Sequence, residues 1–362
     1  MKIELFNDTG NSPHAGCQAV SNAHAAMLGK AGHKIIHREF VQHHKTHWTN
    51  LEEPTAAAAI QSVLDDEKLM AKIDEVDAVI VNGEGTIHHG NGYHLLAILG
   101  AAQTLHKQTL LVNAVFEETE GFDDVLSKLL DFTLRDVKSY EHAIDRGFRC
   151  RLVWDSSLAA EYNHAPLTDF AGQTIVTDWH GDRNHDTGRT ALDYLAKHRE
   201  SSFYFPLISG AAYKSWKHMP ASFAQADMII SGRHHANYFA CKAGTPFICM
   251  PSNSHKIQGF IDLLEEDIPF VTDRDQLTEA YKHVIKNKDM YKRIKEKVES
   301  QLPLTIFNRL GTASDSTKSA ELKRLDSDVA RARKHMMKLH LEPFKYMDGI
   351  VNQALTLGEP LP

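Results

Sequence analysis

The sequence predicts two doubly wound α/β domains and, after them, a long amphipathic helix. Its 362 residues match two domains of about 150 residues each. Short apolar runs alternate with helix-period segments almost from end to end, which is the pattern of repeated βαβ units. Several of these runs, such as 78–81 and 247–250, are continuously apolar, as expected for parallel strands covered on both faces.

The expected elements follow in chain order. In the first domain, apolar runs predict strands at 3–7, 34–40, 78–82, 109–115 and 151–154. In the second domain, they predict strands at 174–177, 203–208, 228–231, 247–250 and 269–271. Helical periodicity covers 17–28, 56–70, 93–106, 189–198 and 234–243. Neither the strand pattern nor the helical periodicity persists through the polar stretch at 161–173. We therefore expect domains at 1–165 and 166–315 and a helical extension at 316–362.

The extension has a single apolar stripe within 319–341. Apolar residues recur there at alternating steps of three and four, at Leu322, Leu325, Val329, Ala332, Met336 and Leu339. This is the spacing of an amphipathic helix. The helix either packs back across the two domains or forms the seam of a homodimer.

Composition restricts the partners and the compartment. A formal charge of −7 gives no general attraction to nucleic acid. Residues 282–345 hold 16 Lys and Arg against 8 Asp and Glu, which is either a solvated helical face or a contact for an anionic membrane. The four cysteines include no C-x-x-C pair, and no stretch is long and apolar enough to span a bilayer. We therefore expect a cytoplasmic protein, with or without peripheral contact to the inner face of the membrane.

Ligands of parallel sheets bind beyond the carboxyl ends of the strands, and with two sheets the natural site is the cleft between them. The first candidate motif, Asn82-Gly83-Glu84-Gly85, directly follows an expected strand. Its glycines allow a ligand to approach the backbone closely, and Glu84 is suited to accept hydrogen bonds from sugar hydroxyls or to act as a base. His88 replaces the third glycine of a dinucleotide fingerprint, which disfavours NAD. The alternative is a strand-to-helix turn with an exposed acid.

The second motif, Ser231-Gly232-Arg233-His234-His235, opens the helix expected at 234–243. Backbone N–H groups at a helix start attract an anion, and Arg233 adds a planar fork suited to phosphate or carboxylate. His235 is suited to donate a proton, and Lys256, after the next strand, could reach the same anion. The alternatives are an Arg233 ion pair elsewhere, packed histidines and a surface lysine.

Because the chain has 23 histidines, and histidine is a common metal ligand, metal binding has to be considered. His43 and His47 are four residues apart, and His88, His89 and His94 are close together, but no H-E-x-x-H motif occurs. We therefore expect no catalytic metal.

Further segments extend the series of motifs, namely Leu-Arg-Asp-Val-Lys-Ser at 134–139, Asp155, Ala-Gly-Thr-Pro at 243–246 and Asn-Ser-His-Lys at 253–256. In order and spacing, over roughly residues 5–264, the series resembles the polysaccharide pyruvyl transferase family. The resemblance implies two Rossmann-like domains facing a cleft, as in GT-B glycosyltransferases. It also implies transfer of a pyruvyl group from phosphoenolpyruvate to a sugar, forming a ketal.

The resemblance implies that Arg233 holds the donor and His235 protonates it, with Lys256 as a further basic group. From the residues themselves, Glu84 or His88 would orient or deprotonate the acceptor. We expect His235, Arg233 and Glu84 to be catalytic. The expected donor-binding residues are Arg233, His234, Lys256, Asn253 and Ser231, and the expected acceptor-binding residues are Glu84, Thr86, His88, His89 and Asp8. No cofactor is expected, because phosphoenolpyruvate is a substrate.

The leading hypothesis is thus a pyruvyl transferase that acts on a cell-surface polysaccharide or its lipid-linked precursor. One alternative is a GT-B glycosyltransferase with a nucleotide-sugar donor, because the same helix start and arginine would hold a nucleotide phosphate. Another is a non-catalytic carbohydrate- or anion-binding protein, in which the histidines only form hydrogen bonds.

Overall fold

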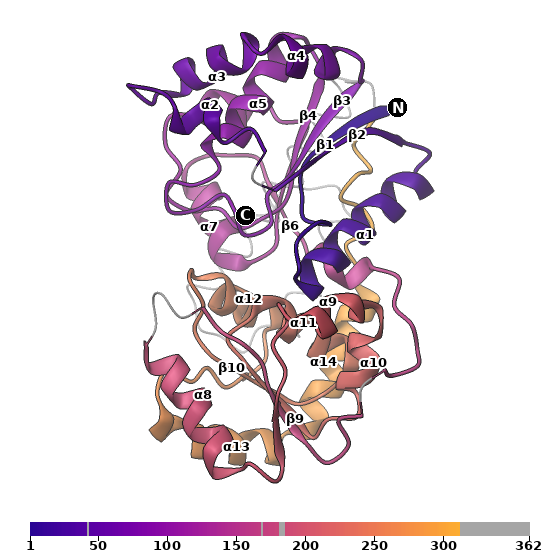
Figure 1. The fold of residues 1–362 in the computed structure, drawn as a ribbon, viewed down its shortest axis with the longest axis vertical. Helices are drawn as coiled ribbons and strands as arrows, with labels where there is room; N and C mark the ends of the chain where they lie inside the picture. The colour runs from indigo at the N-terminus through magenta and orange to yellow at the C-terminus, as the bar shows by residue number, and fades with distance from the viewer. Residues whose placement is uncertain (42, 168, 181–184, 312–362) are drawn as a thin grey trace, which may run out of the picture. The chain divides into compact units, whose positions relative to one another are not determined.

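A computed structural model describes residues 1–41, 43–167, 169–180 and 185–311. It contains two parallel sheets, one of six strands in the order β2-β1-β3-β4-β5-β6 and one of four strands in the order β10-β9-β7-β8. Figure 1 shows helices packed around both sheets. The predicted α/β class, with two doubly wound parallel sheets, is confirmed.

The first sheet lies between two sets of helices (Figure 1). Its strands are β1 (Lys2–Asp8), β2 (Lys34–Phe40), β3 (Ala78–Asn82), β4 (Gln108–Ala114), β5 (Asp131–Leu134) and β6 (Arg151–Leu152). Its helices are α1 (Ala15–Lys30), α2 (Thr46–Thr49), α3 (Ala56–Leu64), α4 (Glu67–Asp74), α5 (Tyr93–Thr104), α6 (Asp123–Ser127) and α7 (Val137–Asp145), and a 3₁₀ turn η1 (Ser156–Ala159) follows β6.

Side chains of β3 alternate between the two faces, as the pleat requires. Ala78 and Ile80 pack in one apolar cluster with residues of α1, whereas Val79 and Val81 pack in another with residues of α3 and α5. All five residues of β3 are buried. An apolar run therefore forms a central strand here because each face has its own helical cover.

The second sheet is smaller. Its strands are β7 (Thr174–Val176), β8 (Ser202–Tyr204), β9 (Met228–Ser231) and β10 (Phe247–Cys249). Its helices are α8 (His185–Lys197), α9 (Gly210–Lys214), α10 (Met219–Phe223), α11 (His234–Ala243), α12 (Lys256–Leu264), α13 (Arg274–Lys286) and α14 (Lys288–Ser300), with a 3₁₀ turn η2 (Trp216–His218) before α10. Gly244 ends α11 in the left-handed conformation, with φ 75°.

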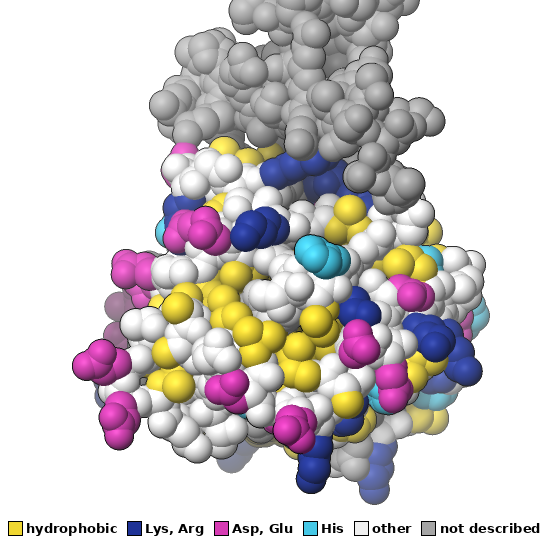
Figure 2. All heavy atoms as spheres, turned by 90° about the horizontal axis from the view of Figure 1, so that it is seen from above, with side chains coloured by type: hydrophobic (Ala, Val, Ile, Leu, Met, Phe, Trp, Pro, Cys, Tyr) yellow, Lys and Arg dark blue, Asp and Glu magenta, His cyan; other side chains and the backbone are white. Residues whose placement is uncertain are grey.

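Figure 2 views the molecule from the end where α3 and α4 lie in Figure 1. Apolar side chains gather on this face among acidic and basic ones. Ala56, Ile60 and Leu64 of α3 are half-buried and pack against the apolar cluster beneath. Helix α3 is thus amphipathic and covers one face of the first sheet.

Some elements of the structure differ from the expectation. Strand β5 is not predicted, because Asp131 interrupts the apolar pattern; its buried carboxylate pairs with Arg151. The strand expected at 269–271 forms only an isolated bridge between Phe270 and Cys249. The helix expected at 56–70 is two helices, because the side chain of Asp66 caps α4 by accepting from Leu69 N at 3.0 Å.

The expected boundary at 165/166 falls between β6 and β7 in the chain, and residues Met1–Leu310 form one compact unit. One apolar cluster contains residues of both sheets, such as Ile80 and Ile229. The amphipathic helix expected at 319–341 lies outside the described residues. Among the residues that the structure describes, no helix has both the length and the apolar character needed to cross a membrane.

Candidate functional site

The candidate site is assembled from segments that follow the strands of both sheets. In the first sheet, Glu84 follows β3, Arg135 follows β5, and Asp155 lies shortly after β6. In the second sheet, His235 lies in the first turn of α11, after β9, and Lys256 begins α12, after β10. All five side chains are buried.

His235 is the centre of this group. Its Nε2 atom lies 3.6 Å from Glu84 Oε1, 3.7 Å from Asp155 Oδ2 and 3.5 Å from Arg135 Nη1. Arg135 Nη1 also donates to Asp155 Oδ2 at 2.5 Å. The structure therefore brings His235 and Glu84 close together, although they follow strands of different sheets. It adds Arg135 and Asp155, which the sequence indicates only through the family resemblance.

Helix α1 approaches His235 closely because it carries a glycine at that point. A Cβ atom on Gly16 would lie 2.1 Å from His235 Cγ, so only a glycine fits there without movement. His14 Nδ1 caps α1 by accepting from Gly16 N at 3.0 Å, and the His14 and His235 rings lie 5.5 Å apart. Sequence reasoning missed both residues, because a glycine in the first turn of a helix is not a specific signal.

Glu84 is held in a strained backbone conformation, with φ 36°. Its carboxylate accepts hydrogen bonds from Asn82 Nδ2 and from Cys17 Sγ, each at 3.2 Å. These contacts come from β3 and α1, and they aim Glu84 Oε1 at His235. The observation favours a positioned carboxylate over an exposed turn residue.

Two cationic groups lie beside the glycine turn. A Cβ atom on Gly85 would have Arg135 Nη2 at 3.7 Å and Lys256 Nζ at 3.9 Å as its neighbours. Burial, with Arg135 and Arg233 nearby, lowers the pKa of Lys256 to about 7. Burial opposes the charged form of Arg135, but Asp155 and Glu84 together with Tyr238 raise its pKa. An anion bound at this turn would meet a guanidinium and a readily protonated amine.

The guanidinium of Arg233 contacts side chains outside the His235 group. Its Nε donates to Asp178 Oδ2 at 2.5 Å, and its Nη1 lies 2.7 Å from His180 Nε2. Ser231 Oγ accepts from Arg233 N at 2.9 Å, so Ser231 shapes the turn that presents the arginine. The ion pair considered as the alternative for Arg233 is present.

The other expected donor-binding residues have distinct surroundings. Asn253 Oδ1 accepts from Lys256 Nζ at 2.5 Å and so positions the amine. The ring of His234 packs edge-on against Tyr238, at 4.7 Å, and Phe260, at 5.8 Å. Both buried nitrogens of His234 have no hydrogen-bond partner. His234 is therefore placed as a packed ring, outside the polar network of His235.

Of the expected acceptor-binding residues, Thr86, His88 and His89 lie along the turn after β3. Thr86 Oγ1 accepts from Asn7 Nδ2 at 3.1 Å, and His88 Nε2 donates to Gly85 O at 2.8 Å. Burial and the neighbouring Lys256 lower the pKa of His88 to about 4. His89 lies 3.0 Å from Glu118 Oε2 and 3.2 Å from Asn253 O, so it links the segments after β3 and β10.

Asp8 is not part of this group of contacts. Its buried carboxylate pairs with Arg38 Nε at 2.9 Å and accepts from Gly10 N at 2.8 Å. These contacts hold the turn that follows β1.

His255, which the sequence places in the Asn-Ser-His-Lys motif without a role of its own, is a further polar link. Its Nδ1 lies 3.1 Å from Glu117 Oε2, and its Nε2 lies 3.0 Å from Ser139 Oγ and 3.3 Å from Asp136 Oδ1. Burial opposes protonation, but Asp136 and Glu117 raise the pKa of His255. His255, next to Lys256, is thus held by residues that follow strands of the first sheet.

The fold is shared with sugar-nucleotide enzymes of GT-B type. A UDP-GlcNAc 2-epimerase from Methanocaldococcus jannaschii has a TM-score of 0.51 at 12% identity, over 83% of this chain and 100% of that chain. The S. aureus MnaA structure with UDP has a TM-score of 0.53 at 11% identity, over 82% and 90% of the two chains. At such low identity, the similarity shows a GT-B-like fold alone.

The sequence identifies the family. The model of the polysaccharide pyruvyl transferase family matches residues 26–254. The chain belongs to this family and is a transferase, as the motifs at 83–86 and 231–235 imply. No match is found among curated protein sequences.

Proposed function

We propose that the protein transfers a pyruvyl group from phosphoenolpyruvate to two hydroxyls of a sugar, within a cell-surface polysaccharide or its precursor. The observation that carries the proposal is the position of His235 Nε2, within 3.7 Å of two carboxylates and 3.5 Å of the Arg135 guanidinium. An acid–base group, carboxylates and cations are what this reaction needs.

The donor would bind through its two anionic groups. Arg135 and Lys256 flank Gly85, and the N-terminus of α11 adds backbone N–H groups. Arg233 would be a second guanidinium for the donor, held in place by Asp178. A phosphate beside Lys256 would favour the protonated amine, so donor binding and protonation of Lys256 would support each other.

His235 would act as the general acid on C3 of phosphoenolpyruvate. Burial lowers the pKa of His235, while Asp155 and Glu84 oppose this effect. A highly charged anionic donor would raise the pKa of the imidazole again, so that the ring carries its proton when the donor is bound. Proton transfer to C3 converts the methylene into a methyl group and leaves an oxocarbenium centre at C2.

Two sugar hydroxyls would then attack C2 in turn. After the first attack, the bond from C2 to the phosphate oxygen breaks and phosphate leaves; the second attack closes the ketal. One of the two hydroxyl protons returns to His235, and the other leaves with phosphate. Glu84, fixed by Asn82 and Cys17, would first take the proton that returns to His235 and pass it to Nε2, 3.6 Å from Glu84 Oε1, so that both residues end the cycle in their starting states.

We also propose that the reaction takes place in the cytoplasm. Cys17, Cys150, Cys241 and Cys249 are free thiols, which is consistent with a reducing compartment. If the acceptor is lipid-linked, the basic residues of α13 and α14 are suited to contact anionic headgroups. A homodimer remains a proposal based on the stripe at 319–341.

A phosphate-release assay with phosphoenolpyruvate and galactose, mannose or N-acetylhexosamine acceptors tests the proposal. Wild-type protein should release phosphate only when a suitable acceptor is present. His235→Gln should lower the rate by about 10²- to 10⁴-fold, the usual contribution of a general acid. The matched control is His164→Ala, which removes an exposed histidine and should leave the rate unchanged.

The second candidate is a glycosyltransferase, because a cationic turn and a helix N-terminus also suit a nucleotide diphosphate. Melting temperatures with phosphoenolpyruvate and with CDP-, CMP-, UDP- and GDP-sugars separate the two functions. Stabilisation by a nucleotide sugar and none by phosphoenolpyruvate would rule out pyruvyl transfer. Binding without any phosphate release, unchanged in His235→Gln, would indicate a non-catalytic binding protein.

A further inference from the structure

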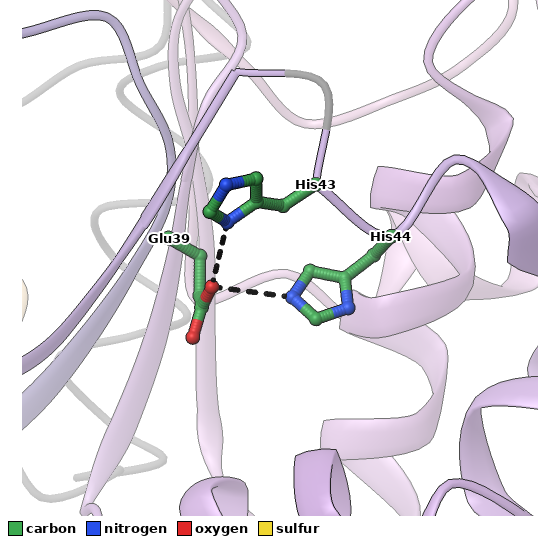
Figure 3. Close-up of side chains that lie close together, drawn as sticks. All are labelled: Glu39, His43 and His44. Atoms are coloured by element: carbon green, nitrogen blue, oxygen red, sulfur yellow. Dashed lines mark hydrogen bonds and ion pairs between the residues drawn. The ribbon is translucent and has the colours of Figure 1, made fainter. Parts of the chain in front are cut away.

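A compact group of possible metal ligands lies outside the site described above. Glu39 is near the end of β2, and His43 and His44 belong to the turn that follows it. Figure 3 shows both imidazoles pointing toward the same carboxylate oxygen of Glu39. His43 Nδ1 lies 3.0 Å from Glu39 Oε2, and His44 Nε2 lies 3.4 Å from it.

These separations are close to those of a tetrahedral metal site. With metal–ligand bonds of about 2.0–2.1 Å, neighbouring ligand atoms of a tetrahedral ion are about 3.4 Å apart. The three potential ligand atoms all lie within 4.8 Å of one another. One ion could thus be bound by all three with only small side-chain movements.

The group contains a buried nitrogen whose contact with Glu39 lacks the geometry of a hydrogen bond. His44 Nε2 is buried and makes no hydrogen bond, although it faces Glu39 Oε2. An unpartnered buried nitrogen is costly, and a metal ion between the two atoms would remove that cost. The His44 ring is held by a stacked contact with His47, at 5.9 Å, and an edge contact with Phe6, at 5.8 Å.

The Glu39 carboxylate is held in place by Lys72. Lys72 Nζ donates to Glu39 Oε1 at 2.5 Å, which leaves Oε2 for the imidazoles. Although burial opposes ionisation, Lys72 and His43 lower the pKa of Glu39 to about 2.

We propose that Glu39, His43 and His44 bind one divalent transition-metal ion of the zinc class, with water in the fourth position. Two imidazole nitrogens and one carboxylate suit Zn²⁺, Co²⁺ or Ni²⁺, whereas Mg²⁺ and Ca²⁺ prefer oxygen ligands. The side chain of His43 is 50% exposed, so the ion can enter from solvent. The ion would tie the turn after β2 to the strand. The group includes neither His235 nor its neighbours, so this inference does not depend on the proposed function.

The test is metal titration of the full chain after treatment with a chelator. Calorimetry with ZnCl₂ should show one tight site per chain, and Co²⁺ should give the visible absorption of a four-coordinate ion. His43→Ala, at a half-exposed position, and Glu39→Gln, which keeps the shape of the side chain, should each weaken Zn²⁺ binding at least about tenfold. His164→Ala should bind as wild type does, which controls for ordinary surface histidines.

Apo-protein melting temperatures show whether each variant is folded, and Zn²⁺ should raise the melting temperature of wild type more than that of His43→Ala. The proposal is overturned if wild type binds no Zn²⁺, or if both ligand variants bind it as tightly as wild type. His44, His47 and Asp66 form a neighbouring group with ligand-like spacing. Loss of binding in His47→Ala and Asp66→Asn, but not in His43→Ala, would place the ion there and contradict the proposal.

Discussion

His235 and His234 are adjacent in the chain and have opposite surroundings. The His235 imidazole faces two carboxylates and a guanidinium, whereas the His234 imidazole faces two aromatic rings and no hydrogen-bond partner. Their positions on α11 point them in different directions, because successive helical residues are about 100° apart. The same residue type thus contacts polar groups at one position and aromatic rings at the next.

His234→Phe is expected to stabilise the protein. The substitution removes two buried nitrogens without partners and keeps an aromatic ring against Tyr238 and Phe260. We expect a gain of about 1 kcal/mol in the free energy of unfolding, the order of the cost of an unsatisfied buried group. Urea denaturation measures it. His234→Ala is the comparison and should destabilise by leaving a cavity; a loss of stability in His234→Phe would contradict the assigned packing.

Glu4 predicts a pH dependence of stability. Both of its carboxylate oxygens are buried without partners, and burial together with Glu39 raises its pKa from 4.5 to about 8. Between these values the folded protein retains a proton that the unfolded chain has lost. The contribution of Glu4 to stability is therefore present below pH 4.5 and is lost as the pH rises through about 8.

Glu4→Gln should remove this loss, because the amide stays neutral at every pH. The variant and wild type should be similarly stable near pH 5, and the variant should gain relative to wild type toward pH 8, by up to about 1.4 kcal/mol per pH unit. Denaturant unfolding at several pH values measures the difference. A constant difference across this range would show that the carboxyl group of Glu4 does not change protonation on unfolding.

At the scale of elements, helix α1 fits the site because of Gly16. Gly16→Ala would place a Cβ atom within 2.3 Å of the His235 ring, whereas Gly29→Ala, in the same helix, meets nothing within 4 Å. We expect Gly29→Ala to stabilise the protein by about 0.5–1 kcal/mol through helix propensity. Gly16→Ala should displace His235 or α1 and lower phosphate release. Equal activity of the two variants would mean that the contact between α1 and His235 is unimportant for catalysis.

Element lengths depend on capping and pairing as much as on apolar pattern. Strands β2, β3 and β9 match their predicted bounds. The apolar runs of β3 and β9 end at a polar residue followed by a glycine. Strand β5 is not predicted because it begins with the charged residue Asp131, whose partner Arg151 lies in the next strand. The break between α3 and α4 comes from the capping carboxylate of Asp66, which a periodicity argument alone does not reveal.

At the scale of the whole molecule, both sheets contribute to one apolar cluster within the compact unit Met1–Leu310. We expect differential scanning calorimetry to show one cooperative transition for this part of the chain, since neither sheet can unfold without exposing the shared cluster. Phosphoenolpyruvate should shift that transition as a unit, because its proposed ligands come from both sheets. Two separate transitions, only one of which shifts with the donor, would contradict this expectation.

The sequence by itself determines the class of fold, the family and the strand-end motifs, because all three depend on local patterns. Apolar periodicity identifies β3 and β9, and residue order identifies Glu84, Arg233, His235 and Lys256 as candidates. Local patterns do not, however, specify which side chains meet.

Only the tertiary structure decides that Glu84 and His235, 151 positions apart in the chain, lie 3.6 Å from each other. It also decides that Arg135 and Asp155 face the same imidazole, that Gly16 makes room for it, and that His234 packs elsewhere. The physical reason is that these contacts depend on how two sheets and α1 pack together. Burial and charge at the site arise only once that packing exists.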